Sequence, residues 1–135
     1  MMFLDANIIL RFLTRDDPAK AERCFELFQR ADRGEVELTT SESVLAEVVC
    51  VLSSPRLYHL APERIRDLLL PILNLRGLKL SSRQLYRRAL AIYAASHIDF
   101  EDALTVAHME RRGINEVLSY DRHFDRVEGV VRQEP

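Results

Sequence analysis

Apolar and polar residues change their spacing repeatedly along the chain, and these changes predict strands that alternate with helices. Short apolar or alternating runs predict strands at residues 2–5, 36–39, 78–80, 117–119 and 130–131. Apolar residues at helical spacing predict helices at residues 7–14, 18–33, 44–52, 65–73, 81–96, 101–112 and 121–126. This alternation is typical of an α/β fold with a mostly parallel sheet and right-handed crossovers.

The first of these strands introduces an acid. Residues 1–4 are apolar, so we expect a buried strand that ends at Asp5 and turns directly into a helix. In an open parallel sheet the carboxyl ends of the strands line the ligand crevice. A carboxylate held there is costly unless something positive meets it. Asp5 is therefore a candidate functional residue, and other acids that reach the same place would share its site.

Glu47 is the only charged residue in the apolar run of residues 44–52. At 100° per residue it shares a helical stripe with Val44, Val48 and Val51. A helix-edge Glu that reaches to water would explain this position. The alternative is a carboxylate aimed into a cleft and matched by a cation.

Asp99 and Asp102 lie three residues apart at a predicted helix start. Acids in a first helical turn complement the helix dipole, which explains Glu101 well, and Asp99 itself suits the cap. Asp102 differs because it shares its helix face with Val106 and Met109. It is therefore the stronger candidate for a functional role.

Asp121 follows the predicted strand at residues 117–119 and precedes a short helix, so helix capping alone would explain it. Like Asp5, however, it comes just after the carboxyl end of a strand. A cluster of Asp5, Glu47, Asp102 and Asp121 would protonate in part or bind a divalent cation. Oxygen ligands suit Mg²⁺ or Mn²⁺ rather than Zn²⁺.

Length and composition are ordinary for one soluble domain covering residues 1–135. The net charge of −2 neither demands nor excludes a nucleic-acid partner. Cys24 and Cys50 lie in helical apolar patterns, so we expect two buried free thiols. The four His are expected at the surface. With no apolar run long enough to span a membrane and no cationic leader, we expect a cytoplasmic protein.

Four segments together resemble the PIN-domain ribonucleases, specifically the toxins of VapBC-type pairs. The resemblance runs from Met2 to about Val131, and four short matches in the right order make it specific. The matching segments are Phe-Leu-Asp-Ala-Asn at 3–7, Val-Leu-Ala-Glu-Val at 44–48, Asp-Phe-Glu-Asp-Ala-Leu at 99–104 and Leu-Ser-Tyr-Asp-Arg-His-Phe at 118–124.

The resemblance implies a Rossmann-like PIN sandwich, with about five mostly parallel strands flanked by helices. It implies a divalent-metal-dependent endoribonuclease, the toxin of a type II toxin–antitoxin system, acting as a homodimer and inhibited by a cognate antitoxin. The family's acidic quartet falls on Asp5, Glu47, Asp102 and Asp121, with Asp99 or Glu101 able to assist or substitute. Whether one or two Mg²⁺ or Mn²⁺ ions bind stays open.

Other residues receive supporting roles. Asn7 and Ser119 are expected to orient the metal ligands. An acidic site repels phosphate, so Arg residues must hold the RNA, with Arg11 and Arg15 as candidates. The segment from Ser53 to Leu73 is expected to contribute to a dimer or antitoxin interface. The apolar residues expected to be exposed there are Leu57, Tyr58, Leu60, Leu68 and Leu69.

Three other functions share part of this sequence pattern. A haloacid-dehalogenase-like phosphatase needs a second acid two residues after Asp5, where this chain has Asn7. A receiver-type phosphoacceptor module needs an acidic pair after its first strand and a Lys near its last strands, and neither is present. A PIN-like RNA-binding or regulatory module without nuclease activity stays compatible with the sequence.

Overall fold

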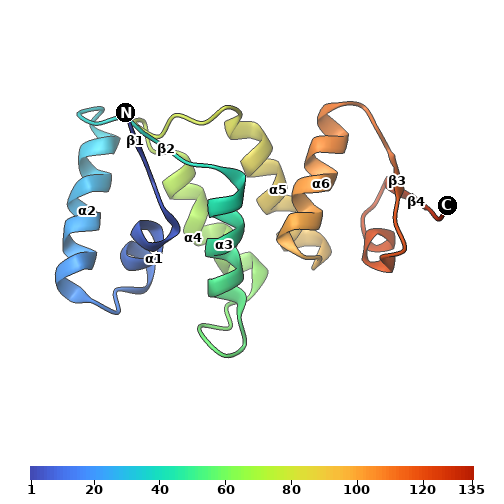
Figure 1. The fold of residues 1–135 in the computed structure, drawn as a ribbon, viewed down its shortest axis with the longest axis horizontal. Coiled ribbons are helices and arrows are strands. Elements are labelled where there is room, and N and C mark those ends of the chain that lie inside the picture. Colours follow the sequence, from blue (N-terminus) through green and yellow to red (C-terminus); the bar gives the residue numbers. More distant parts are fainter. The chain divides into compact units, whose positions relative to one another are not determined.

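The computed structural model describes residues 1–135 as two compact units, residues 1–81 and residues 82–135 (Figure 1). The first unit contains β1 (Met2–Phe3), α1 (Ala6–Thr14), α2 (Pro18–Asp32), β2 (Leu38–Thr39), α3 (Glu42–Ser53) and α4 (Pro62–Leu73). The second contains α5 (Arg83–Ser96), α6 (Phe100–Arg111), β3 (Glu116–Leu118), the 3-10 helix η1 (Arg122–Arg126) and β4 (Val131–Gln133). This matches the predicted order of strands and helices, except that the strand predicted at residues 78–80 is only an isolated bridge at Leu78 and the last predicted helix is a 3-10 helix.

Every strand pairing in the structure is parallel, as predicted. In the first unit β1 pairs with β2, and Leu38 of β2 forms an isolated parallel bridge with Leu78. In the second unit β3 pairs with β4, in the register Val117 to Arg132. The α/β class is therefore confirmed. The strands are shorter than predicted and form two two-stranded sheets, so the predicted single sheet of about five strands is not confirmed.

The prediction that the first strand is buried was wrong for most of its residues. Met2 is 53% exposed and Phe3 is 62% exposed, whereas Leu4 is only 2% exposed. Side chains project from the two faces of a strand rather than from its hydrogen-bonded edges. The pairing of the two-residue β1 with β2 therefore does not cover Met2 and Phe3, and no other part of the first unit buries them.

A close backbone approach fixes the identity of Gly77 in the first unit. A Cβ atom at this position would lie 2.3 Å from the carbonyl oxygen of Val36 and 2.6 Å from that of Ala31. Only glycine fits such contacts, which lets the Gly77 carbonyl accept a 2.8 Å hydrogen bond from the Leu38 amide. This bond connects β2 to the segment that enters the Leu78 bridge.

Aromatic and aliphatic side chains hold the helices of each unit together. In the first unit the Phe12 ring stacks on Phe25 and meets Phe28 edge-on, at centroid distances of 6.2 and 4.9 Å. In the second unit α5 packs against α6, where the Tyr93 and Phe100 rings meet edge-on at 5.7 Å. Such ring pairs add to the free energy gained by burying their area.

The two cysteines occupy different environments. Cys24 is buried, as predicted, but Cys50 is exposed, so the prediction of a second buried thiol was wrong. Cys50 lies on α3 between the buried residues Val49 and Leu52, where the helix turns one face to solvent. None of the helices has both the length and the apolar character needed to cross a membrane.

We predict that Thr40→Val lowers the free energy of unfolding by about 1–3 kcal/mol, because it leaves a buried acceptor without its donor. The Thr40 hydroxyl is buried and donates a 3.0 Å hydrogen bond to the Leu4 carbonyl. The measurement is urea denaturation followed by circular dichroism. Thr39→Val is the control, since the Thr39 side chain makes no hydrogen bond, and equal losses in both variants would contradict the prediction.

Candidate functional site

Asp5 lies where β1 gives way to α1, and hydrogen bonds hold the chain immediately before it. The Leu4 amide donates to the Thr39 carbonyl at 2.8 Å, and the Leu4 carbonyl accepts from Thr40 at 3.0 Å. Asp5 is the N-cap residue of α1, yet its side chain makes no capping hydrogen bond. The exposed carboxylate is therefore held at a defined place and left without a partner.

Glu47 lies on α3 in the same unit. Ser41 is the N-cap residue of this helix, and its hydroxyl accepts a 3.3 Å hydrogen bond from the Val44 amide. Helix α1 follows β1, and α3 follows the parallel strand β2. Both helices therefore start from the same end of the strand pair, where the carboxyl ends of the two strands lie. Helix α1 packs against α3, and Glu47 is exposed while the neighbouring Val48 is buried.

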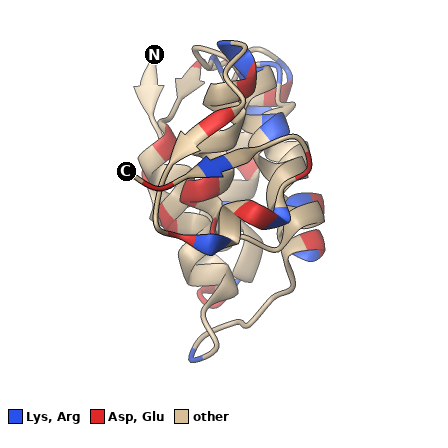
Figure 2. Ribbon diagram, turned by 90° about the vertical axis from the view of Figure 1, so that its right-hand side faces the viewer, with Lys and Arg blue, Asp and Glu red and all other residues tan.

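The two Arg residues predicted to bind RNA differ in their surroundings. Arg11 is half-buried on α1 and forms no ion pair with an acid. Arg15 is the exposed C-cap residue of α1, and its Nη2 lies 3.6 Å from Glu22 Oε2. Arg11 therefore has the more available positive charge. Acidic and basic positions are otherwise interspersed along the ribbon (Figure 2).

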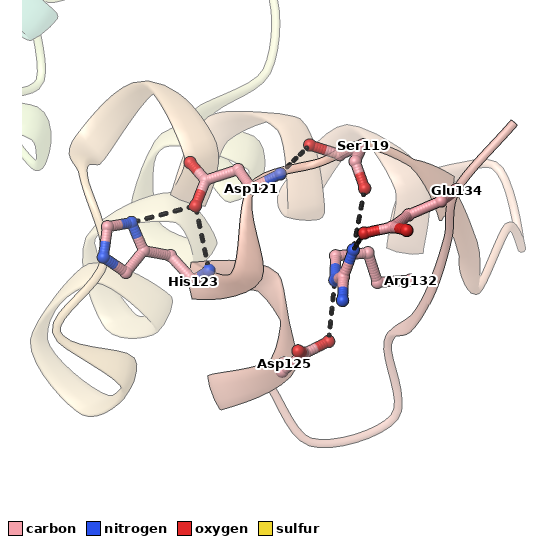
Figure 3. Close-up of polar contacts among 6 residues, drawn as sticks. All are labelled: Ser119, Asp121, His123, Asp125, Arg132 and Glu134. Atoms are coloured by element: carbon pink, nitrogen blue, oxygen red, sulfur yellow. Dashed lines mark hydrogen bonds and ion pairs between the residues drawn. The ribbon is translucent and has the colours of Figure 1, made fainter.

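In the second unit a tight turn after β3 positions Asp121. The Ser119 hydroxyl accepts a 3.0 Å hydrogen bond from the Asp121 amide (Figure 3). Oδ1 of Asp121 accepts from the His123 amide at 2.9 Å and lies 3.0 Å from Nδ1 of the His123 ring. The Asp121 side chain thus caps η1, as the sequence predicted, and commits one of its two oxygens to this role.

Asp102 is half-buried in the first turn of α6 and lies in a field of negative charge. Burial raises the pKa of its carboxyl above the usual range, and the nearby Asp121 and Asp99 carboxylates raise it further, while His123 opposes them. Asp102, Asp121 and Asp99 therefore act on one another electrostatically. Asp99 is the N-cap residue of α6, but its side chain makes no capping hydrogen bond.

Arg132 is a residue of this region that the sequence did not single out. Its Nε donates to Asp125 at 3.1 Å, and its Nη1 donates to Glu134 at 2.9 Å and to the Ser119 carbonyl at 3.1 Å (Figure 3). The two carboxylates, Glu134 first, raise the pKa of Arg132. This side chain connects β4 to the turn that carries Asp121. The one feature of the sequence that could have indicated this role is that Arg132 is the only charged residue of the last strand.

The predicted metal ligands therefore divide between the units, with Asp5 and Glu47 in the first and Asp102 and Asp121 in the second. Within neither unit do three or more Asp, Glu, His or Cys side chains form a group that could hold a metal ion. The convergence of all four carboxylates stays a prediction. The four His are exposed, as expected, although His123 contacts Asp121.

Comparison with known proteins identifies the class. Residues 2–130 match the model of the PIN domain family, so the chain belongs to that family. It is also similar to "VapC ribonuclease" of Aquifex aeolicus (strain VF5), with 27% identity over 127 residues, which cover 94% of this chain and 92% of that protein. The family predicted from the four short segments is confirmed.

We predict that Asp102→Asn raises the melting temperature by a few degrees at pH 7 in EDTA. The raised pKa means that the folded chain binds this proton more tightly than the unfolded chain. The stability linked to the proton is complete below the usual pKa of 3.8 and is lost as the pH rises through the raised value. Asp102→Asn carries no charge at this position and avoids that loss. Its higher melting temperature should therefore disappear below about pH 3.8, where the parental carboxyl is protonated as well.

The measurement is a series of melting curves between pH 3 and pH 8 followed by circular dichroism. Asp32→Asn, at the exposed end of α2, is the control because Asp32 has no ionic partner. The explanation fails if both variants show the same dependence on pH, or if Asp102→Asn is less stable than the parent at pH 7.

Proposed function

We propose that this protein is a metal-dependent endoribonuclease and the toxin of a type II toxin–antitoxin pair. Membership of the PIN family and similarity to a VapC ribonuclease bear out the predicted ribonuclease class. The observation that carries the proposal is that the PIN family match extends from residue 2 to residue 130, so it spans all four candidate acids.

We also propose that residues 1–135 act as one PIN domain with a single sheet of about five strands. The matched family model extends across both units, from residue 2 to residue 130. The parallel pairs β1–β2 and β3–β4 and the bridge at Leu78 supply the five segments that such a sheet needs. Exposed apolar residues on these strands, Phe3 at 62% and Leu118 at 72%, would gain from being covered.

The residues of the proposed site fit a hard divalent cation. Asp5, Glu47, Asp102 and Asp121 offer only oxygen ligands, which suits Mg²⁺ or Mn²⁺ and not Zn²⁺. The carboxylates of Asp5 and Glu47 have no cationic partner, and the environment of Asp102 already favours added positive charge. A bound metal ion would lower the pKa of an attacking water and offset charge on the phosphate.

The chain's own groups would orient the ligands and the substrate. The Ser119 hydroxyl fixes the turn before Asp121, and His123 engages Oδ1 of Asp121, which leaves Oδ2 available for a ligand. Asn7, exposed in the first turn of α1, is placed two residues after Asp5 to orient it or its ligand. The free guanidinium of Arg11 on the same helix would attract the RNA backbone.

The proposed partners are RNA, a cognate antitoxin and a second copy of the chain. The segment from Ser53 to Leu73 has one strongly exposed apolar residue, Leu57, at 61%. Tyr58 is half-buried and its hydroxyl donates to Asp16, whereas Leu69 is fully buried, so the expectation that Leu69 is exposed was wrong. The interface that we propose for a second copy of the chain or for the antitoxin is therefore centred on Leu57 and is smaller than the sequence predicted. The cytoplasmic location stays a prediction.

We predict that the wild-type protein cleaves RNA in Mn²⁺ and that Asp5→Asn largely abolishes cleavage. Loss of a residue that only orients a ligand typically costs about 10–100-fold, so loss of a direct ligand should cost more. The measurement is the initial rate of cleavage of total RNA on denaturing gels, with and without EDTA. Asp32→Asn, which removes an exposed carboxylate without a partner, should cleave at the parental rate.

Equal cleavage by wild type and Asp5→Asn would contradict the nuclease proposal by pointing to a contaminating enzyme. Retained RNA binding with no cleavage in any protein would favour the PIN-like RNA-binding module instead. Mapping the cut positions in the same experiment would identify the sequence or structure that the enzyme recognises.

We also predict that Mn²⁺ stabilises the folded protein in the absence of RNA. Binding to the native state alone stabilises by about 1.4 kcal/mol when the free ion exceeds its Kd tenfold. The measurement is the shift in melting temperature on titration with MnCl₂, at an ionic strength held constant with NaCl. Asp102→Asn should reduce the shift and Asp32→Asn should retain it. An equal shift in both variants would rule out Asp102 as a ligand.

A further inference from the structure

A pocket between α1 and α2 of the first unit is lined by cations and contains no acid. Its volume is about 370 Å³. The lining residues are Asn7, Ile8, Arg11, Lys20, Arg23 and Cys24. The two helices that form it pack directly against each other and lie side by side (Figure 1).

Helical spacing explains why these residues face one another. Asn7 and Arg11 are four residues apart on α1, so they lie on one face of that helix. Lys20 and Arg23 are three apart on α2, and Cys24 adjoins them on the same face. The Phe12 ring, packed between Phe25 and Phe28, holds the two helices in this arrangement.

The positive charge in the pocket is largely uncompensated. Arg11 and Arg23 form no ion pair with an acid, and Lys20 Nζ lies 3.9 Å from Asp17, at the limit of an ion pair. Arg11 acts on the buried Cys24 thiol, where its charge opposes the rise in pKa caused by burial, so its guanidinium lies on the pocket side of α1. Two guanidinium groups without acidic partners are available to a ligand that carries negative charge.

We propose that this pocket binds a backbone phosphate of the RNA substrate. Guanidinium groups form paired hydrogen bonds with phosphate oxygens, and the Asn7 amide adds a neutral donor. Asn7 lies two residues after Asp5, so the pocket lining begins within the first turn of α1, next to the candidate metal ligand. This inference rests on the proposed ribonuclease function and adds Lys20 and Arg23 to the residues that contact substrate.

The experiment measures binding of a fluorescein-labelled single-stranded RNA of about twelve nucleotides to the wild-type chain by anisotropy. EDTA prevents cleavage, and Kd is determined across a series of NaCl concentrations. Each lost phosphate contact lowers the slope of log Kd against log salt by about 0.7 for a single strand. We expect this change for Arg11→Gln and for Arg23→Gln, and a parental slope for Arg11→Lys, which retains the charge.

Arg64→Gln is the matched control, because Arg64 is an exposed Arg on α4 of the same unit and has no partner. It should retain the parental slope. Melting curves of all variants separate loss of contact from loss of folding, since a misfolded variant loses its melting transition. Parental slopes in folded Arg11→Gln and Arg23→Gln would overturn the proposal. Capture of an acidic peptide by the pocket, with those RNA slopes unchanged, would overturn it in favour of a protein ligand.

Cleavage of unlabelled RNA by the wild type in Mn²⁺ is scored separately. If the wild type cleaves RNA and the salt slopes of Arg11→Gln and Arg23→Gln are unchanged, the proposed phosphate site is wrong and the proposed ribonuclease function stands. If those slopes are reduced and the wild type does not cleave RNA, the proposed ribonuclease function is wrong and the pocket is a phosphate site on an RNA-binding module.

Discussion

The pairing of β1 with β2 is the constraint on which the candidate site of the first unit depends. The Leu4 backbone is bound on both sides, through its amide to Thr39 and through its carbonyl to the buried Thr40 hydroxyl. Because the two strands are parallel, α1 and α3 start from the same end of the strand pair. Asp5 and Ser41 both follow the carboxyl end of a strand at this place. A hydrogen-bonded strand end can hold a charged residue at a fixed place without using its side chain.

The second unit uses polar side chains for the same purpose. Ser119 and His123 fix the turn around Asp121, and Arg132 connects that turn to the last strand and to two carboxylates. The concentration of acid there has a cost, since burial and neighbouring carboxylates raise the pKa of Asp102. Proteins accept such costs where function requires them, and a site that binds a cation recovers the energy when the cation arrives. In the first unit the opposite charge collects in the pocket between α1 and α2.

The parts of the fold that depend on near neighbours were predictable. Asp17 caps α2 by accepting from the Lys20 amide at 3.2 Å, and Pro18 occupies the first turn, as this pair of residue types indicates. Exposure was harder to predict, because it depends on what covers a residue. Met2, Phe3 and Cys50 all lie in apolar patterns yet face water, and Leu69 was expected at the surface yet is fully buried. An apolar pattern indicates which residues favour burial but not whether the fold has enough surface to cover them.

The sequence by itself determined most of the order of strands and helices, the choice of four candidate acids and the family, because each depends on residue types at short and regular spacing. Only the tertiary structure decided which groups meet across large separations. Thr40 reaches Leu4, and Arg132 reaches Ser119. Arg11, Lys20 and Arg23 line one pocket although they come from two helices. The physical reason is that such contacts depend on how helices and strands pack, and packing is set by the shape and burial of the whole unit rather than by the residues in contact.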